Sequence, residues 1–221
     1  QYAVQECARG MSCPMKSGWS ILNKIGRYLS GKPRLVMKFL WQVQQSLATS
    51  YTDSDWAGCR KTAKRTSGGI VTSGSHVIKS YSRQQKVIAL SSAEAETYGM
   101  VACSTELLGL QACARDLGIS LGVSVYADAS AALGIIKRRG IGKMRHMQTQ
   151  SLCLQEAHAT KRIHFEKIDG SRNPADLLTK HLAGVLMDRH MRVIGALPED
   201  GRAVTEPTLA SLGINEAPLH G

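Results

Sequence analysis

The stretch YTDSDWAG, residues 51–58, places two aspartates one residue apart at the end of a run that is readable as a β-strand. Carboxylates are poor strand formers, and burying one costs free energy unless it is paired or binds a cation. A strand that carries an aspartate into a sheet therefore indicates a use for it. Asp53 ends the strand pattern, whereas Asp55 follows it, where aspartate is a common turn residue.

Composition limits the class of protein. The chain has 221 residues, enough for one principal domain plus appendages. Lys and Arg number 28 against 17 Asp and Glu, a formal net charge of +11. Such an excess attracts polyanions, so nucleic acid is the leading class of partner. No apolar run approaches the roughly 20 residues of a membrane-spanning helix, and we expect no membrane partner.

The cysteines and histidines argue against a zinc site. The six cysteines form no CxxC pair, and the seven histidines do not lie beside them at ligand spacing. Cys103 and Cys113 fall in a helical pattern as small apolar fillers, which fits a reducing compartment. The N-terminus QYAVQECARG has no signal-peptide character and no initiator Met, so we expect a piece of a longer chain.

The hydrophobic pattern predicts an α/β protein. In the first third of the chain we expect a helix at 18–29, an extended segment at 34–45 and a strand at 47–54. A basic loop at 60–69 and two close-set strands at 69–74 and 76–82 are expected next, followed by a long helix from 91 to about 118. The rest is expected to contain a strand at 123–128, helices at 129–139 and 144–158, a strand at 162–168 and a helix opening at 174. Close-set strands favour antiparallel pairing, and helical crossovers demand parallel pairing. One mixed sheet flanked by helices satisfies both.

Local signals support these boundaries. Gly74 and Ser75 join the second and third strands in a predicted tight hairpin. Ser91 and Glu94 form a predicted capping box, and Asn173 is the expected N-cap of the last helix. The tail beyond about residue 197 shows no periodicity and is predicted to be mobile.

Four acidic residues lie where a side chain is awkward to place unless it serves a function: Asp53, Glu96, Asp128 and Asp176. Converging carboxylates repel one another unless a cation holds them, and oxygen-only ligands indicate Mg²⁺ or Mn²⁺. Two such ions can drive phosphodiester cleavage. Structural alternatives remain open, because Asp128 could simply start a helix and Asp176 could be only the acid of the Asn173 cap. Asp55 and Glu94 have ready structural roles.

Six segments contain more specific sequence motifs: YTDSDWAGC (51–59), RTSGGIV (65–71), KSYSRQQKVIALSSAEAETYG (79–99), VYADASAALGI (125–135), GKMRHMQTQ (142–150) and NPADLLTKHL (173–182). Together they resemble, in this order, the ribonuclease H domain of Ty1/copia-type retrotransposon polyproteins. The N-terminal segment MSCPMKSGWSILNKIGRYLSGKPRLV (11–36) is similar to the segment that joins reverse transcriptase to that domain.

The resemblance implies a ribonuclease H-like fold, with a five-stranded mixed sheet flanked by helices, and cleavage of the RNA strand of RNA·DNA hybrids made by reverse transcription. The family's four acids match Asp53, Glu96 (the second Glu of SSAEAE), Asp128 and Asp176, which implies two Mg²⁺ ions, with Mn²⁺ as a substitute. Residues 1–45 are then the end of the reverse transcriptase or connection segment, 46–183 the ribonuclease H-like domain, and 184–221 a C-terminal helix and mobile tail. The implied partner is the reverse transcriptase portion of the same polyprotein, and the implied location is intracellular, in a cytoplasmic retroelement particle or the nucleus.

Basic residues flank the expected site and are candidate contacts for the hybrid backbone: Lys61, Lys64, Arg65, Arg83, Lys86, Lys137, Arg138, Arg139, Lys143 and Arg145. The alternative is that they lie on solvated loops. Many cellular ribonucleases H carry a histidine on a loop shortly before the last acid, but residues 169–173 (DGSRN) contain none. His164 falls in the preceding strand, where we expect a structural or surface role.

Two other functions compete with this interpretation. The chain could be a catalytically silent nucleic-acid-binding relic of a retroelement Pol protein, although all four acids are present. It could also be a DNA-strand-transfer enzyme on the same fold. Those enzymes typically carry three acids with Glu last, whereas the order here is Asp, Glu, Asp, Asp.

Overall fold

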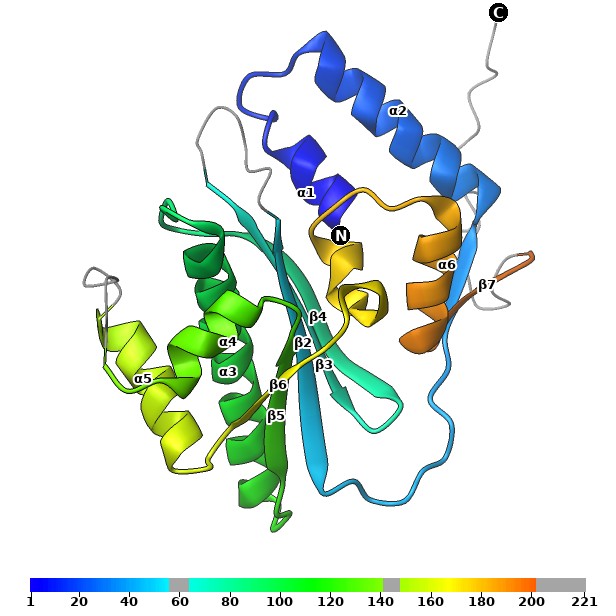
Figure 1. The fold of residues 1–221 in the computed structure, drawn as a ribbon. Coiled ribbons are helices and arrows are strands. Elements are labelled where there is room, and N and C mark those ends of the chain that lie inside the picture. The colour runs from blue at the N-terminus through cyan, green and yellow to red at the C-terminus, as the bar shows by residue number, and fades with distance from the viewer. Residues whose placement is uncertain (56–63, 141–147, 202–221) are drawn as a thin grey trace, which may run out of the picture.

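A five-stranded mixed sheet organises the computed structural model, which describes residues 1–55, 64–140 and 148–201 (Figure 1). The strand order is β4-β3-β2-β5-β6. Its members are β2 (Leu47–Asp55), β3 (Thr66–Ser73), β4 (His76–Gln84), β5 (Gly122–Ala127) and β6 (His164–Lys167). The first three pair antiparallel, β5 pairs parallel with β2, and β6 pairs parallel with β5. The expected ribonuclease H-like fold class is confirmed.

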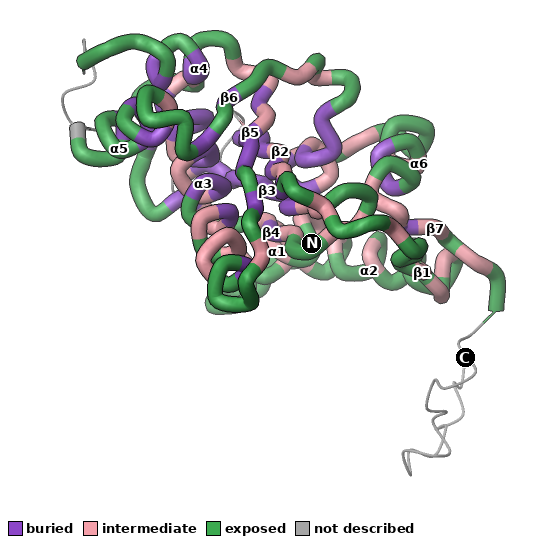
Figure 2. The backbone as a smooth tube through the Cα atoms, turned by 90° about the horizontal axis from the view of Figure 1, so that it is seen from below, coloured by how far each residue is buried: buried purple, intermediate pink, exposed green. Residues whose placement is uncertain are grey.

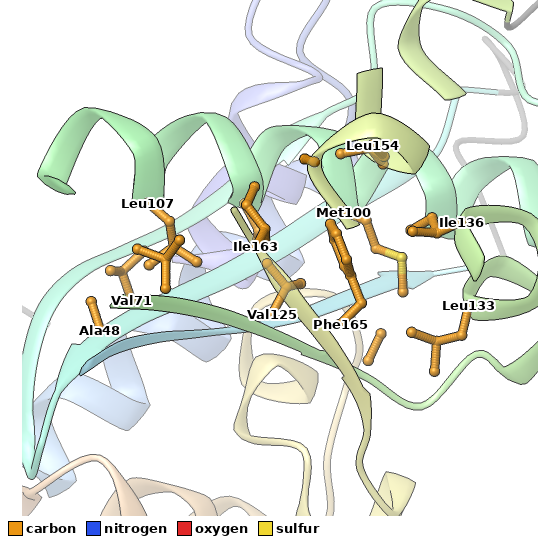
Figure 3. Close-up of a cluster of buried hydrophobic side chains, with 14 of the residues drawn as sticks. Ala48, Val71, Met100, Leu107, Val125, Leu133, Ile136, Leu154, Ile163 and Phe165 are labelled. Carbon is orange, nitrogen blue, oxygen red and sulfur yellow. The ribbon is translucent and has the colours of Figure 1, made fainter. Parts of the chain in front are cut away.

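Three helices cover one face of the sheet and enclose the core. They are α3 (Ser92–Asp116), α4 (Ser130–Lys137) and α5 (Gln148–Ala159). The helical spacing expected for α3 is observed, since Met100, Cys103 and Leu107 are fully buried against Val71 and Val125 of the sheet (Figure 3). Buried residues are concentrated in the central strands and the inner faces of these helices (Figure 2).

The opposite face carries two short 3₁₀ helices, η2 (Gly170–Arg172) and η3 (Pro174–Leu178). The N-terminal helices α1 (Tyr2–Ala8) and α2 (Lys16–Gly31) and the C-terminal helix α6 (Gly184–Val193) lie on this side (Figure 1). A separate antiparallel pair joins β1 (Arg34–Met37) to β7 (Ala196–Glu199). The segments expected before residue 46 and after residue 183 therefore lie together, and the three-part division of the chain stays a prediction.

The strand β3 begins earlier than the sequence pattern indicated. Residues 60–69 were expected to form a loop, but β3 starts at Thr66 and runs through the pair Gly68 and Gly69. Both glycines face crowded neighbours: a Cβ at Gly68 would lie 2.7 Å from Leu178 Cβ, and one at Gly69 would collide with the Tyr81 ring. Close packing, rather than a turn, explains these glycines.

Three further expectations are corrected. The helix expected to open at 174 is a 3₁₀ helix with the predicted Asn173 cap, and α6 follows it as a separate helix. The tail expected beyond 197 is paired as far as Glu199 because β7 adds to β1, while residues 202–221 lie outside the described part. Cys113 is exposed on α3 and fills no core position, unlike Cys103.

The predicted hairpin at Gly74 and the predicted Ser91 cap are confirmed. Gly74 has a positive φ of 58° between β3 and β4, as a tight hairpin requires. Ser91 caps α3 by accepting a hydrogen bond from the Glu94 N–H, and the Glu94 carboxylate accepts one from the Leu90 N–H. Among the described residues, no helix is long and apolar enough to span a bilayer.

Close contact between α3 and β2 depends on Gly99. A Cβ at this position would lie 2.8 Å from Thr52 Oγ1 and 3.0 Å from Ser54 Oγ. Gly109, ten residues along the same helix, is exposed, and a Cβ there meets nothing within 4 Å.

This difference predicts opposite effects for one substitution at two positions. Gly99→Ala is expected to destabilise the protein by about 1–3 kcal/mol because the helix is forced away from β2. Gly109→Ala is expected to stabilise it by about 0.5–1 kcal/mol through helix propensity alone. Urea unfolding of both variants measures the difference, and equal stabilisation by the two would show that α3 does not depend on this close approach.

Candidate metal centre

Parallel pairing places two aspartates side by side. In the register of β2 and β5, Thr52 lies opposite Ala127, so Asp53, still within β2, and Asp128, the first residue after β5, lie side by side near the carboxyl ends of the two strands. This is the carboxyl edge of both strands, where open α/β sheets place their ligands. Alternation along β2 turns Thr52 and Ser54 toward α3 and Asp53 toward η3.

A third acid arrives on η3, which is tied to the sheet by Asn173. Its fully buried side chain donates from Nδ2 to the Thr52 carbonyl at 2.9 Å and accepts from the Ala175 N–H at 3.2 Å. The bare backbone of Gly68 lets η3 lie directly on β3. Asp176 is thereby held over the end of β2.

The three aspartates converge on one point. One carboxylate oxygen each from Asp53, Asp128 and Asp176 lie within 4.8 Å of one another. Asp53 is 3% exposed, and the other two are half-buried. Burial and the neighbouring charge of Asp53 raise the pKa of Asp128, and the same two causes raise the pKa of Asp176 to about 6. The chain therefore holds like charges together at an electrostatic cost.

Glu96 lies beside this group but is not one of the three. It occupies the first turns of α3 and is 6% exposed. Burial, followed by the charges of Asp53 and Asp128, raises its pKa to about 9. No described residue donates a hydrogen bond to its Oε2. A buried carboxylate with an unpartnered oxygen next to three others fits a hard, oxygen-seeking cation.

Two further residues enter the site that the sequence did not single out. Thr179 donates its hydroxyl to Asp53 Oδ2, and Lys180 Nζ lies 2.9 Å from Asp176 Oδ1 and 3.5 Å from Asp53 Oδ2. Burial alone would lower the pKa of Lys180, but the nearby carboxylates, Asp53 first, outweigh it and raise that pKa. The sequence feature that could have indicated Lys180 is its i,i+4 spacing from Asp176 in NPADLLTK.

A buried polar network supports the α3 end of the site. Gln85 Nε2 lies 2.8 Å from both Ser67 Oγ and the Ala95 carbonyl, and Ser54 Oγ lies 3.0 Å from that same carbonyl. Ala95 directly precedes Glu96, so strands β2 and β3 and the residue after β4 all fix the backbone that carries this glutamate. The side chain of Gln85 was not predicted to matter, because an isolated glutamine has no distinguishing sequence pattern.

The neighbouring acids have structural positions. Glu94 is buried and takes part in the cap of α3. Asp55 was expected in a turn after the strand, but it is the last residue of β2 and pairs with Thr66. The antiparallel partner β3 extends the strand further than the hydrophobic pattern indicated. His164 is exposed on β6, consistent with the surface role expected for it.

The basic candidates differ in exposure. Arg65 is only 8% exposed and presents little surface to a ligand, and Lys64 is half-buried. The exposed candidates are Arg83, which pairs with Glu106, and Lys86, Lys137, Arg138 and Arg139. Lys61, Lys143 and Arg145 lie outside the described residues. A role for any of them in binding nucleic acid stays a prediction.

One basic segment has a defined backbone. The buried amide of Gln155 on α5 donates to the carbonyls of Ile135 and Gly140, at 2.8 and 3.0 Å, and accepts from the Gly140 N–H at 3.1 Å. These bonds hold both ends of residues 137–139, which lie exposed at the end of α4. The three positive charges therefore project from a fixed turn.

The fold and the acidic edge define a ribonuclease H-like α/β protein with a candidate cation site. The chain is 29% identical over 199 residues to a retrovirus-related Pol polyprotein from transposon RE2 of Arabidopsis thaliana, in a match that covers 89% of this chain and 14% of the relative. It is 28% identical over 181 residues to the Pol polyprotein from transposon TNT 1-94 of Nicotiana tabacum, covering 81% of this chain and 14% of that one. These relatives confirm the resemblance to retrovirus-related Pol polyproteins of copia-type transposons. The chain spans about one seventh of their length.

Solved structures give a looser likeness. The N-terminal RNase H domain of a Mycobacterium tuberculosis protein, solved as a fusion with maltose-binding protein, superposes with a TM-score of 0.45 and 18% identity, covering 67% of this chain and 98% of that one. No protein-family model matches the chain. The fold class depends on the strand order and register described above.

The raised pKa of Glu96 predicts how stability depends on pH in the absence of metal. Because its pKa in the folded protein, about 9, exceeds the ordinary value of 4.5, its stabilising contribution is complete below pH 4.5 and is lost as pH rises to 9. Glu96→Gln removes this dependence. Relative to the parent in EDTA, the variant is expected to become progressively more stable between pH 5 and 9, as measured by thermal melts.

Glu94→Gln is the matched control on the same helix. It is expected to cost about 1 kcal/mol or less through the cap and to keep the loss of stability that Glu96 causes as pH rises. If the melting temperatures of the parent and of Glu96→Gln changed with pH in the same way across this range, the prediction would be wrong. The charge of the Glu96 carboxylate would then be compensated by neighbouring groups in the metal-free protein.

Proposed function

We propose that this chain is the ribonuclease H domain of a copia-type retrotransposon polyprotein and cleaves the RNA strand of RNA·DNA hybrids. The observation that carries the proposal is the convergence of Asp53, Asp128 and Asp176 at the carboxyl edge of β2 and β5, with Glu96 beside them. Similarity to retrovirus-related Pol polyproteins supports the substrate class.

Asp53, Glu96, Asp128 and Asp176 are the residues that would hold two Mg²⁺ ions, or Mn²⁺ in their place. When bound, such ions supply an activated water and stabilise the charge that develops during phosphodiester hydrolysis. The chain's own residues organise the site. Thr179 orients Asp53, Asn173 fixes η3 and therefore Asp176, and Gln85 fixes the backbone before Glu96. Burial of Asp53 and Glu96 lowers the local dielectric and strengthens every charge interaction there.

The proposed substrate contact follows from charge. The exposed residues 137–139 carry three positive charges on a turn clamped by Gln155, which suits contact with a phosphate backbone. The reverse transcriptase portion of the same polyprotein is the proposed source of the hybrid, and we place the protein inside the cell, where reverse transcription of a retroelement occurs.

Replacing Asp53 tests the acidic centre. Asp53→Asn keeps the side-chain shape but removes charge where three carboxylates converge, so cleavage of a labelled RNA·DNA hybrid in Mg²⁺ is expected to fall by at least about a hundredfold. Asp55→Asn removes the same charge two residues along β2 and is expected to cleave within about threefold of the parent. A cleavage time course with purified proteins measures both.

Near-parental cleavage by Asp53→Asn would remove this residue from the catalytic set. A parent that binds the hybrid but cuts none of it in millimolar Mg²⁺ or Mn²⁺ would instead identify a catalytically silent nucleic-acid-binding module. Cleavage of both strands, or joining of DNA ends, would indicate the chemistry of strand-transfer enzymes.

Replacing the basic turn tests the substrate contact. Changing Lys137, Arg138 and Arg139 together to Ala is expected to weaken hybrid binding and to reduce the slope of log K against log salt. The reduction is up to about 0.9 for each phosphate that the variant no longer neutralises. The matched control replaces three exposed basic residues of α2, Lys16, Lys24 and Arg27, and removes the same charge. Equal slopes for the two triple variants would place residues 137–139 on a merely solvated surface.

A further inference from the structure

A lysine side chain enters the acidic centre from just beyond η3. Lys180 Nζ lies 2.9 Å from Asp176 Oδ1 and 3.5 Å from Asp53 Oδ2. The same Asp53 oxygen accepts the Thr179 hydroxyl. One ammonium group therefore contacts two of the three carboxylates that converge at this edge of the sheet.

Backbone geometry holds Lys180 at this point. The Lys180 N–H donates to the Asp176 carbonyl at 3.3 Å, so the two side chains leave the chain one turn apart on the same side. The hydroxyl of Thr179 fixes the preceding residue to Asp53. The contact of Lys180 with Asp53 and Asp176 therefore follows from the backbone conformation at the end of η3, and not only from the rotamer of the lysine side chain.

Exposure differs between the partners of this ion pair. The side chain of Lys180 is 41% exposed, whereas those of Asp53 and Asp176 are 5% and 13% exposed. The carboxylates are fixed, and the flexible four-carbon lysine stem reaches them from the solvent side. The ammonium group can therefore leave the site without any movement of the strands.

We propose that Lys180 is a built-in counter-ion of the acidic centre, which stabilises the metal-free protein and has to be displaced when a divalent cation binds. The inference rests on the proposed metal site. An ammonium group that lies between Asp53 and Asp176 and a divalent cation held by the same two carboxylates repel each other and compete for the same negative charge. Any free energy by which Lys180 stabilises the metal-free centre is subtracted from the observed affinity for metal.

The test is a calorimetric titration of Mg²⁺, and separately Mn²⁺, into the metal-stripped full chain, with thermal melts in EDTA. Lys180→Gln is expected to lower the Kd for either ion by about three- to tenfold. A change of this size is expected because the variant removes a partly exposed ion pair that competes with the metal for Asp53 and Asp176. The variant is also expected to melt at a lower temperature than the parent in EDTA, so that its rise in melting temperature on adding metal is larger.

Two controls isolate the charge from its surroundings. Lys24→Gln removes an exposed lysine on α2 and is expected to keep the parent's Kd and melting temperature. Lys180→Arg keeps the positive charge and is expected to bind metal no more tightly than the parent. If Lys180→Gln does not fold in EDTA, the Lys180→Arg titration still decides, because tighter binding by that variant would contradict competition by charge.

An unchanged or higher Kd in Lys180→Gln would overturn the proposal, as would the absence of binding in both the parent and this variant. Binding only in the variant would support it. Hybrid cleavage is scored separately: a parent that binds metal but cuts no hybrid refutes the proposed function and leaves the counter-ion role standing, because the titration involves no substrate.

Discussion

Mutual repulsion of carboxylates at one edge of the sheet is the constraint on which the rest of the structure depends. Asp53, Asp128 and Asp176 place oxygens within 4.8 Å of one another, and Glu96 lies buried beside them with a pKa of about 9. Such a group is stable only if other parts of the fold hold it together. The acids come from four separate parts of the chain, so their convergence comes from tertiary packing.

That packing relies on unusually close backbone approaches. The glycine at 99 brings α3 against β2, and the glycine at 68 brings η3 against β3, so acids reach the end of β2 from both faces of the sheet. Asn173 ties η3 to the Thr52 carbonyl, one residue before Asp53. Together these contacts tie the elements that carry the acids to the packed core, so the positions of the carboxylates are fixed by the core.

Sequence patterns predicted much of this and missed the rest for physical reasons. Strand alternation, helix periodicity and the caps at Ser91 and Asn173 are local, and they located the mixed sheet and the order of the acids. Helical spacing and the capping box already separated Glu96 from Glu94, and the quoted motifs pointed to the same glutamate. The start of β3 was missed because Gly68 and Gly69 read as a loop, although tertiary crowding requires them. Pairing of β1 with β7 spans most of the chain, and the roles of Gln85 and Lys180 depend on contacts between elements, so no local pattern contained them.

The central claim is that these carboxylates form one divalent-cation site. Anomalous scattering from crystals of the protein grown in millimolar Mn²⁺ tests it most directly, because manganese is located independently of any assay. We expect anomalous density bounded by the side chains of Asp53, Asp128 and Asp176, with Glu96 at its margin and Lys180 turned toward solvent. Manganese bound only elsewhere on the surface, with Lys180 still paired to Asp53 and Asp176, would contradict the claim.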